Sequence, residues 1–438
     1  MATQQPKMAG PILVDRQEAM NRVKRQAKFA VIEIPEKEKT NLKLDELHIE
    51  IDVEGEENDF KVDGVPADSS QVSSMTKFAK PAPLHCPGSV PLPTTSSVFT
   101  TLSKSFPSMT RLPDGETGIR KNYIFFQLAV FSQCPWVVTP FELYEEQGVH
   151  EREEKTNDEE AKVDWSSQGA KKAIILNETG YAIAALASYE EFKKARDEGI
   201  IGERVKFQVS LPMPFEIPSF CILPEFQAEV EKLYAEKIAQ DLRAIQSALP
   251  AENLAIQFDV PFAIAMLEGL VTPWFAKNRD DLKEQLGERF KKMAGLVKEG
   301  VEMGFHLCYG DYKHQHFMEP KDTAILVELN NLIQKFVERK INWVHLPVPK
   351  SRVDVKYFEP LKGMEVKGHG ETEFYLGLVH ANDCEGTKKR IETAAKVLGG
   401  RCFGVGTECG WGRHGDAEFE SMLEVSKSAV SDVEGQKL

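Results

Sequence analysis

Gly304-Phe-His-Leu-Cys-Tyr-Gly-Asp311 is a short apolar run that ends in a polar, glycine-containing turn. The run predicts a buried strand, and residues two apart on a strand point to the same face. His306 and Cys308 would therefore present a nitrogen and a sulfur side by side. Cys409 lies in a second such run, Gly404-Val-Gly-Thr-Glu-Cys-Gly-Trp-Gly412. One His and two Cys suit Zn²⁺, and three protein ligands leave a fourth position open for a substrate, which is typical of a catalytic site.

Similar short runs recur from Pro83 onward and alternate with amphipathic segments, for example 226–249, 281–302, 322–339 and 386–398. Eight strands with helical crossovers predict the α/β class and a (β/α)₈ TIM barrel. The alternative is an open doubly wound sheet, but no G-x-G-x-x-G opens a helix after the first strand. The predicted strands are 84–89, 110–113, 205–211, 254–259, 304–308, 342–347, 374–380 and 402–407.

Two polar segments lie outside this pattern. Residues 1–82 carry charge runs such as Glu54-Gly-Glu-Glu-Asn-Asp59, and they predict an N-terminal arm that is partly extended or disordered. An arm of this kind could pack on a neighbour, so a homo-oligomer is expected through it. Residues 83–438 would form the barrel domain, and an acidic stretch at about 145–172 predicts a surface insertion.

Charge and composition narrow the expected partners. The formal charge of −14 at pH 7 argues against nucleic acid and against an anionic membrane, since no basic field is available to attract phosphates. No apolar run approaches the length of a membrane span, and the first residues lack the apolar region of a signal peptide. Seven cysteines without a framework pattern fit a reducing compartment. We therefore expect a cytoplasmic protein that acts on a small molecule.

Reactive side chains gather where the predicted strands end. Barrel active sites form at the C-terminal ends of the strands, so this placement predicts that these side chains converge. Loop polarity explains part of the pattern, because turns are polar in any protein. The side chains concerned are Ser89, Asp114, Glu116, Asp259, His306, Cys308, His345, His380, Asn382, Asp383, Glu408 and Cys409.

Five short motifs, in matching order, resemble the C-terminal, catalytic barrel of cobalamin-independent methionine synthase. They run from residue 87 to 410, which is essentially the whole predicted barrel. The wider superfamily also contains uroporphyrinogen decarboxylase and zinc-dependent alkyl transferases that use other thiols, such as coenzyme M. The motifs are Pro87-Gly-Ser-Val-Pro-Leu-Pro93, Pro113-Asp-Gly-Glu-Thr-Gly118, Gln257-Phe-Asp-Val-Pro261, His306-Leu-Cys308 and Cys409-Gly410.

The resemblance implies a zinc-dependent transferase in which a metal-bound thiol attacks a methyl or alkyl group. A coordinated thiol is deprotonated at neutral pH by the charge of the metal. The implied zinc ligands are His306, Cys308 and Cys409. An amino-acid-like thiol would be held by Ser89, Glu116 and Asp259, and the implied catalytic residues are His380, Asn382 and Asp259.

Three further residues are candidates for the substrate site. Asp114 either caps the loop after the second strand or takes part in function. His345 is either a core histidine or a fourth metal ligand, and Trp411 could line the mouth of the site.

The chain also departs from the family pattern. The synthase has a glutamate ligand after strand six, where Asn342-Trp-Val-His-Leu-Pro-Val-Pro349 contains no carboxylate. The glutamate that follows the strand-four aspartate is Val260 here, and the N-terminal barrel of the synthase has no counterpart. These departures predict a stand-alone, divergent relative.

A metal-free enzyme resembling uroporphyrinogen decarboxylase remains the alternative. It would perform acid/base chemistry, as a lyase or decarboxylase, on a small substrate. Its working groups would be Asp114, Glu116, Asp259, His306 and His380.

Overall fold

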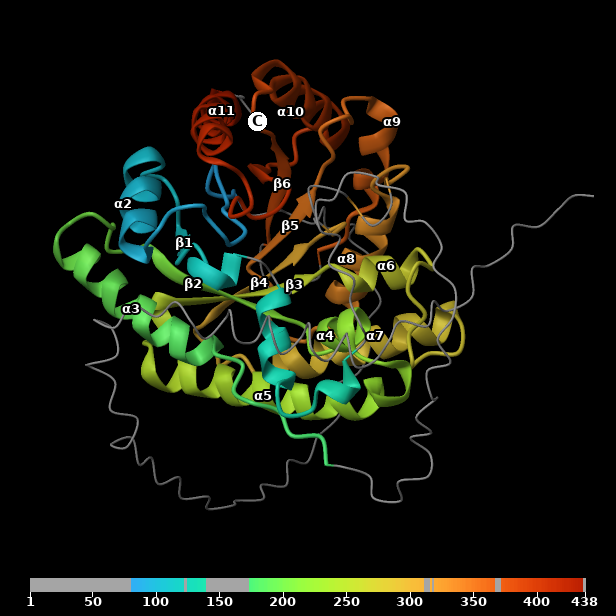
Figure 1. Ribbon diagram of the computed structural model, residues 1–438. Coiled ribbons are helices and arrows are strands. Elements are labelled where there is room, and N and C mark those ends of the chain that lie inside the picture. The colour runs from blue at the N-terminus through green and yellow to red at the C-terminus, as the bar shows by residue number, and fades with distance from the viewer. Residues whose placement is uncertain are drawn as a thin grey trace, which may run out of the picture.

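Seven parallel strands form one sheet in which each strand pairs with its neighbours in chain order (Figure 1). The computed structural model describes residues 80–121, 124–138, 173–310, 316, 319–366 and 372–435. Nearly all of the predicted arm and the whole predicted insertion at about 145–172 lie outside these residues. The strands are β1 Arg111–Pro113, β2 Lys206–Pro212, β3 Leu254–Val260, β4 Glu302–Leu307, β5 Trp343–Pro347, β6 Glu373–Val379 and β7 Gly404–Thr407.

Each strand coincides with a predicted strand, and the ends differ by no more than two residues. The first predicted strand, 84–89, is not a regular strand. It forms a single parallel bridge between Leu84 and Val405 of β7, with hydrogen bonds of 2.9 Å from His85 N to Val405 O and from Val405 N to Pro83 O. The described sheet therefore has seven strands, in an arrangement consistent with a TIM-like barrel.

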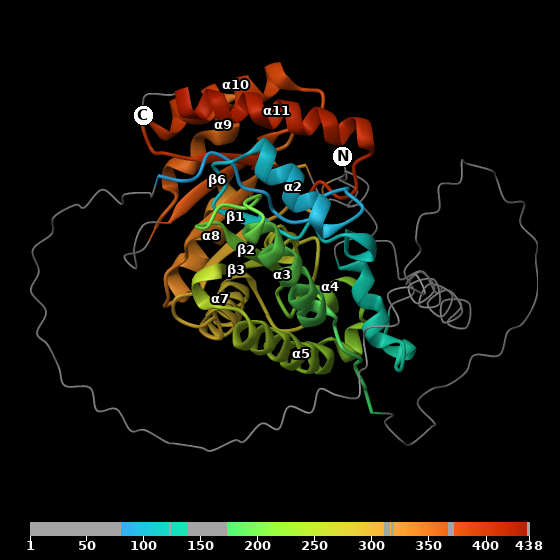
Figure 2. The same ribbon diagram turned by 90° about the vertical axis from the view of Figure 1, so that its left-hand side faces the viewer.

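Helices connect the strands and cover the outer face of the sheet, with α10 and α11 on one side and α3 and α5 on another (Figure 2). The predicted helix 281–302 is wrong at its end, because α7 stops at Gly295 and β4 starts at Glu302. Gly300, with a φ of +84°, makes the turn between them. The helices are α2 Thr95–Ser105, α3 Tyr181–Asp197, α4 Glu216–Cys221, α5 Gln227–Ala248, α6 Phe262–Leu267, α7 Arg279–Gly295, α8 Ala324–Phe336, α9 Val355–Phe358, α10 Cys384–Leu398 and α11 Asp416–Gly435. Short 3-10 helices span Gly118–Lys121, Phe125–Phe131, Pro135–Val137, Pro224–Phe226, Ala251–Asn253 and Glu359–Gly363.

The two faces of the sheet differ in chemistry, as β3 illustrates. All seven of its residues are buried, but alternate side chains point to opposite faces. Ile256 and Phe258 belong to the large apolar core shared with the helices. Ala255 instead packs with Trp343 and Tyr375 in a separate cluster on the inner face.

Arg111 links the N-terminal ends of strands that are far apart in the sheet order. Its guanidinium lies 2.7 Å from Glu302 of β4 and 2.6 Å from Glu373 of β6, and 4.3 Å from the ring centre of Trp343 of β5. Side chains from β1, β4, β5 and β6 can meet in this way only if the sheet curls around them. The inner face of the curled sheet therefore holds buried polar groups from several strands.

The segment from Leu84 is held by the same interior. His85 Nε2 donates to Gln257 Oε1 at 2.8 Å, and the Gln208 amide donates to Cys86 O at 3.1 Å. The ring of His85 lies 5.0 Å from that of Tyr375 between centres. Burial lowers the pKa of His85 to about 3, so this histidine is neutral. Side chains of β2 and β3 thus anchor the segment that bridges to β7.

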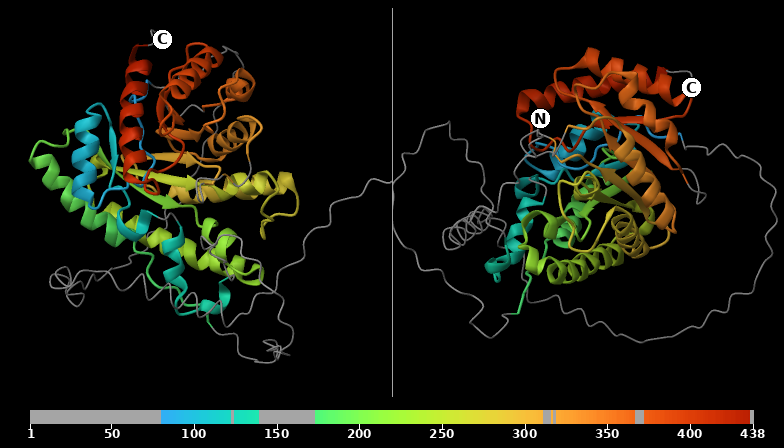
Figure 3. Two further views of the ribbon diagram at one scale, coloured as in Figure 1. Left: turned by 45° about the horizontal axis from the view of Figure 1, so that its top comes forward. Right: turned by 90° about the vertical axis from the view of Figure 1, so that its right-hand side faces the viewer.

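The first and last of the described helices, α2 and α11, lie side by side in every view (Figures 1, 2 and 3). This neighbourhood brings the two ends of the described chain together on one side of the curled sheet. None of the helices in the described part of the chain has both the length and the apolar character that a membrane span requires.

Replacing Arg111 by methionine should lower the free energy of unfolding by roughly 2–4 kcal/mol, because Glu373 would lose this counter-ion and Glu302 would keep only the more distant Lys206, at 3.8 Å. Denaturant unfolding followed by circular dichroism measures this loss. Lys193→Met is the matched control, since its pair with Glu190 is exposed and should be worth no more than about 1 kcal/mol. Equal losses in both variants would show that the interior ion pairs do not support the fold.

Candidate metal and substrate site

The ends of β4 and β7 bring together the three residues with metal-binding side chains. One ligand atom from each of His306, Cys308 and Cys409 lies within 4.8 Å of the others, and the two sulfurs are 3.7 Å apart. His306 and Cys308 follow one another on the same face of the β4 end, as their spacing predicts. Among the described residues this is the cluster of His, Cys, Asp and Glu that could hold a metal ion.

The spacing of this cluster fits zinc. Two Zn–S bonds of about 2.3 Å at a tetrahedral angle place their sulfurs about 3.8 Å apart, close to the 3.7 Å between Cys308 and Cys409. His306 and Cys308 are buried, and Cys409 is half-buried. The donors are soft and already converge, so a zinc ion could bind with little rearrangement of the protein.

Cys409 also has the electrostatic surroundings of a thiolate. The hydrogen bond from Cys308 holds the pKa of Cys409 well below its usual range, although burial opposes the shift. Hydrogen bonding and positive charge from His306, and the guanidinium of Arg413 at 3.7 Å from the sulfur, act in the same direction. A thiolate is the form that binds metals.

His345 lies behind His306 and outside the group of three ligands. Their Nδ1 atoms are 2.8 Å apart, so one ring donates to the other. His345 is fully buried, and burial keeps its pKa well below the usual range. A neutral His345 can accept the Nδ1 proton of His306, which leaves the other ring nitrogen of His306 to face a metal. The structure thus places His345 against His306, where it can orient that ring; contact between His345 and substrate stays a prediction.

The turn that carries Cys409 packs on Ser89. Ser89 O accepts from Trp411 N at 2.7 Å, and Ser89 Oγ accepts from Gly412 N at 3.2 Å. A Cβ atom on Gly410 would collide with Ser89 Oγ, which explains the glycine after the cysteine. Ser89 is thus placed at the site, and these contacts hold the Cys409 turn.

Trp411 packs into the core behind the Cys409 turn, and its predicted place at the mouth of the site stays a prediction. Its side chain is fully buried, donates to Thr407 Oγ1 and packs on Phe419. An aromatic ring after a glycine-rich turn is equally compatible with the core and with a pocket, so its sequence position could not decide between them.

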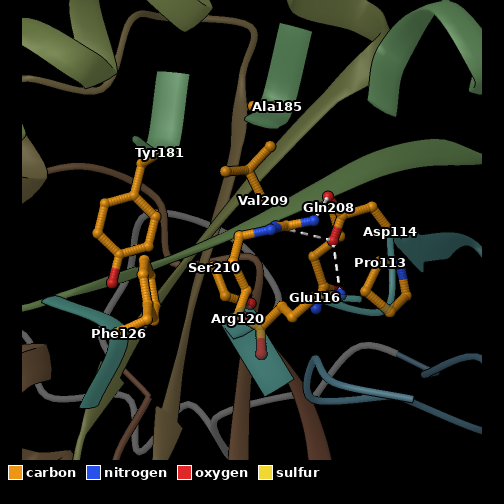
Figure 4. Close-up of a pocket in the computed structure, with 10 residues that line it drawn as sticks. All are labelled: Pro113, Asp114, Glu116, Arg120, Phe126, Tyr181, Ala185, Gln208, Val209 and Ser210. Atoms are coloured by element: carbon orange, nitrogen blue, oxygen red, sulfur yellow. Dashed lines mark hydrogen bonds and ion pairs between the residues drawn. The ribbon is translucent and has the colours of Figure 1, made fainter. Parts of the chain in front are cut away.

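Asp114 is fully occupied by protein partners. Its carboxylate accepts from Arg120 at 2.8 Å, from Ser188 Oγ at 2.7 Å and from the backbone N of Glu116 at 2.8 Å (Figure 4). The last of these bonds holds Glu116 in a left-handed conformation, with a φ of 47°. Asp114 therefore shapes the loop after β1, and Arg120 supplies the cation that its charge needs.

Glu116 and Asp259 are two carboxyl groups that interact electrostatically with Cys409 of the cluster. Burial raises the pKa of Glu116 to about 8; negative charge on Asp114 and Cys409 adds to the shift. Part of the Glu116 residue reaches solvent, but its carboxyl group is enclosed. Burial also raises the pKa of Asp259 well above its usual value, although it accepts from Gln257 Nε2 at 2.8 Å. Both groups are therefore held largely neutral in the absence of a cation.

Arg120 is the residue of this site that the sequence interpretation missed. It follows Gly118 in a short turn, and nothing in its spacing distinguishes it from a surface arginine. The fold places it beside a cavity of about 20 Å³, which has room for roughly one water molecule. Figure 4 shows the Arg120 guanidinium beside the Asp114 carboxylate, and Tyr181 of α3 also lines this cavity.

His380 and Asn382 follow β6. His380 Nε2 donates to Val348 O at 2.8 Å, and its Nδ1 faces Glu408 Oε2 at 4.0 Å. Burial lowers the pKa of His380 to about 4, so the ring is neutral with its Nδ1 lone pair available. Asn382 is exposed, and its backbone N donates to Ser421 Oγ at 2.7 Å. The structure thus places His380 next to the Cys409 turn and leaves Asn382 at the surface.

No protein-family profile matches this chain, and no curated protein matches it. Solved structures do match. One is a B12-independent methionine synthase from Shewanella sp. W3-18-1 in complex with selenomethionine, with 15% identity and a TM-score of 0.38, over 56% of this chain and 66% of that one. Another is a protein from Listeria monocytogenes assigned as a vitamin-B12-independent methionine synthase, with 13% identity and a TM-score of 0.43, over 76% and 86% of the two chains. At these values the likeness assigns no function, so the functional argument rests on the residues.

The pKa of Glu116 predicts a pH-dependent stability. Folded protein keeps this carboxyl protonated up to about pH 8, whereas the unfolded chain loses the proton near 4.5. The unfolded state therefore binds fewer protons between these values, and the free energy of unfolding should fall as pH rises through them, by up to about 1.4 kcal/mol per pH unit.

Denaturant unfolding of metal-free wild type and Glu116→Gln at several pH values between 5 and 9 measures this effect. The stability of wild type relative to the variant should decline with rising pH. The exposed Glu191→Gln should show no such trend. A constant difference between wild type and Glu116→Gln would mean that Glu116 is ionised in the folded protein.

Proposed function

We propose that the protein is a zinc-dependent transferase that activates a thiol, or a similar soft nucleophile, for methyl or alkyl transfer. The convergence of His306, Cys308 and Cys409, with sulfurs 3.7 Å apart, carries the proposal. Three protein donors leave the fourth position of a tetrahedral ion for the substrate. A bound zinc ion would hold the substrate thiol as a thiolate at neutral pH.

Glu116 and Asp259 are the groups that would bind the other end of the substrate. Both residues have enclosed carboxyl groups beside the cluster, and burial raises the pKa values of both. A substrate ammonium group would allow both to ionise and would become their counter-ion. We therefore propose an amino-bearing thiol as substrate, bound through its sulfur at one end and its amino group at the other.

His380 is the group that can move a proton near the thiol. Its Nε2–H is fixed by Val348 O, so the proton must be taken up or released at Nδ1. Glu408 lies on that side and would stabilise the charged ring. Asn382 would contribute indirectly, because the hydrogen bond from its backbone N to Ser421 Oγ helps to hold the loop after β6 in place.

We also propose that the segment 84–89 occupies the eighth strand position of a (β/α)₈ barrel. It bridges to β7 through Leu84, and Val90 N donates to Gly115 O after β1 at 2.8 Å. The segment therefore lies between the two edge strands. Because the segment lacks regular strand pairing, glutamine side chains of β2 and β3 donate hydrogen bonds to its backbone carbonyl groups instead.

A reducing, cytoplasmic location is part of the proposal. The seven cysteines all lie within the described residues and form no disulfide there, and Cys308 and Cys409 stay separate although their sulfurs are neighbours. Zinc-binding cysteines have to be reduced.

Acid/base chemistry without a metal is the second candidate. The observation that favours it is the neutral carboxyl pair, since a carboxyl with a pKa of about 8 is suited to act as a general acid near neutral pH. In that reaction Asp259 or Glu116 would donate a proton and His380 would accept one. Metal content separates the two candidates.

Elemental analysis of purified wild-type protein should find about one zinc per chain. Cys308→Ser should lose most of it, because a hydroxyl is a poorer ligand for zinc than a thiolate. Cys384→Ser is the control, since Cys384 is exposed at the start of α10 and should leave zinc unchanged. Wild type without zinc, even after reconstitution under reducing conditions, would favour the acid/base alternative.

Thermal denaturation with amino-thiols tests the substrate proposal. Homocysteine or cysteine at about 100 times its Kd should stabilise wild type by about 2.7 kcal/mol. Asp259→Asn should lose most of this stabilisation, because it removes one of the two carboxylates that would receive the ammonium.

Asp197→Asn, at the exposed far end of α3, should behave as wild type. Stabilisation of wild type by a purely anionic or uncharged ligand, with none by the amino-thiols, would exclude the ammonium site.

A further inference from the structure

Glu408, the residue before Cys409, is shared by two histidines. Its Oε1 lies 2.8 Å from His316 Nε2, and its Oε2 lies 4.0 Å from His380 Nδ1. Both partners of the shorter contact are largely buried, with side-chain exposures of 12% for His316 and 21% for Glu408. Solvent screens a pair in this position less than it screens a surface pair.

The geometry makes His316 a cation. Its Nδ1 lies 2.9 Å from Glu319 Oε1, while its Nε2 meets Glu408. Carboxylate oxygens only accept hydrogen bonds, so both ring nitrogens have to carry protons. Burial works against the charge, but the hydrogen bond and charge of Glu408, together with Glu319, raise the pKa of His316 to about 9.

Each residue of this pair lies close in sequence to one of the two cysteines. His316 follows Cys308 by eight residues, and Glu408 directly precedes Cys409. The ion pair therefore joins His316 to the turn that leaves β7. Other bonds of this turn run elsewhere: Thr407 Oγ1 donates to Cys409 O at 2.7 Å, and Gly412 N donates to Ser89. These bonds hold the turn to its own strand and to the segment 84–89.

We propose that His316 and Glu408 form a clamp that holds the Cys409 turn against the β4 side of the site and so keeps the two sulfurs at metal-binding distance. The inference rests on the proposed zinc site and adds to it two positioning residues that are not metal ligands. Residues that fix ligands in this way commonly change metal affinity by about 10–100-fold when they are replaced.

The rate of zinc transfer to a chromophoric chelator tests the clamp. His316→Gln and Glu408→Gln, each loaded with zinc, should lose the metal about tenfold faster than wild type. The double variant should be no worse than either single one, because both changes break the same contact. His316→Lys keeps a cation and should recover part of the retention. Such recovery in His316→Lys would also show that the faster zinc loss of His316→Gln is not simply a folding defect.

His414→Gln is the matched control. Its pair with Glu418 lies beyond the same turn at 3.0 Å but stays within one segment, so zinc loss should be unchanged. His316→Gln that retains zinc as wild type does, or His414→Gln that loses it equally fast, would overturn the clamp.

A second measurement works on metal-free protein. Phenylarsine oxide condenses with two neighbouring thiols, releasing one water, and mass spectrometry follows the adduct. Capture of Cys308 and Cys409 should be slower in His316→Gln than in wild type and unchanged in His414→Gln. If wild type binds no zinc, the proposed function fails and this rate alone decides the clamp: equal capture rates in wild type and His316→Gln would overturn it.

Discussion

The alternation of side chains along parallel strands that are buried on both faces is the constraint on which the rest of the structure depends. The outward face of β3 is apolar and packs on helices, while its inward face carries Gln257 and Asp259. Inward polar groups cannot be left without partners in a dry interior. Arg111 and Gln257 satisfy groups from several strands at once, which favours the curled arrangement over a flat sheet.

The curled sheet also decides the chemistry of the site. Parallel strands present their C-terminal ends at one rim, so the soft donors at the ends of β4 and β7 lie beside the carboxyl group that follows β1 and the one at the end of β3. Exclusion of water acts on these groups in different ways. It favours the neutral forms of Glu116, Asp259 and His345, whereas hydrogen bonds and nearby positive charge favour the thiolate of Cys409. A cluster of soft donors thus adjoins two buried carboxyl groups that the fold holds largely neutral.

Several residues that were predicted to meet the substrate have structural contacts in the fold that the sequence did not reveal. Asp114, Ser89 and His345 hold neighbours in place through hydrogen bonds, and Trp411 belongs to the core. Strand-end position identifies which residues reach the rim, but it does not tell a group that meets substrate from one that supports it. That difference depends on partners such as Arg120 and His316, which come from loops without a periodic pattern.

The sequence by itself determined the strand positions and the pairing of His306 with Cys308 on one face, because both follow from local spacing. Alternating apolar runs located the seven strands of the described sheet, and the His-x-Cys spacing needs only the geometry of one strand to put both side chains on one face. Cys409 joins them only through the fold. Tertiary structure alone decided the charge states and the supporting contacts. The pKa of Glu116 depends on burial by distant segments, and the role of Glu408 depends on His316, some ninety residues away in the chain. Burial and long-range contacts are properties of the packed molecule, so no local pattern could specify them.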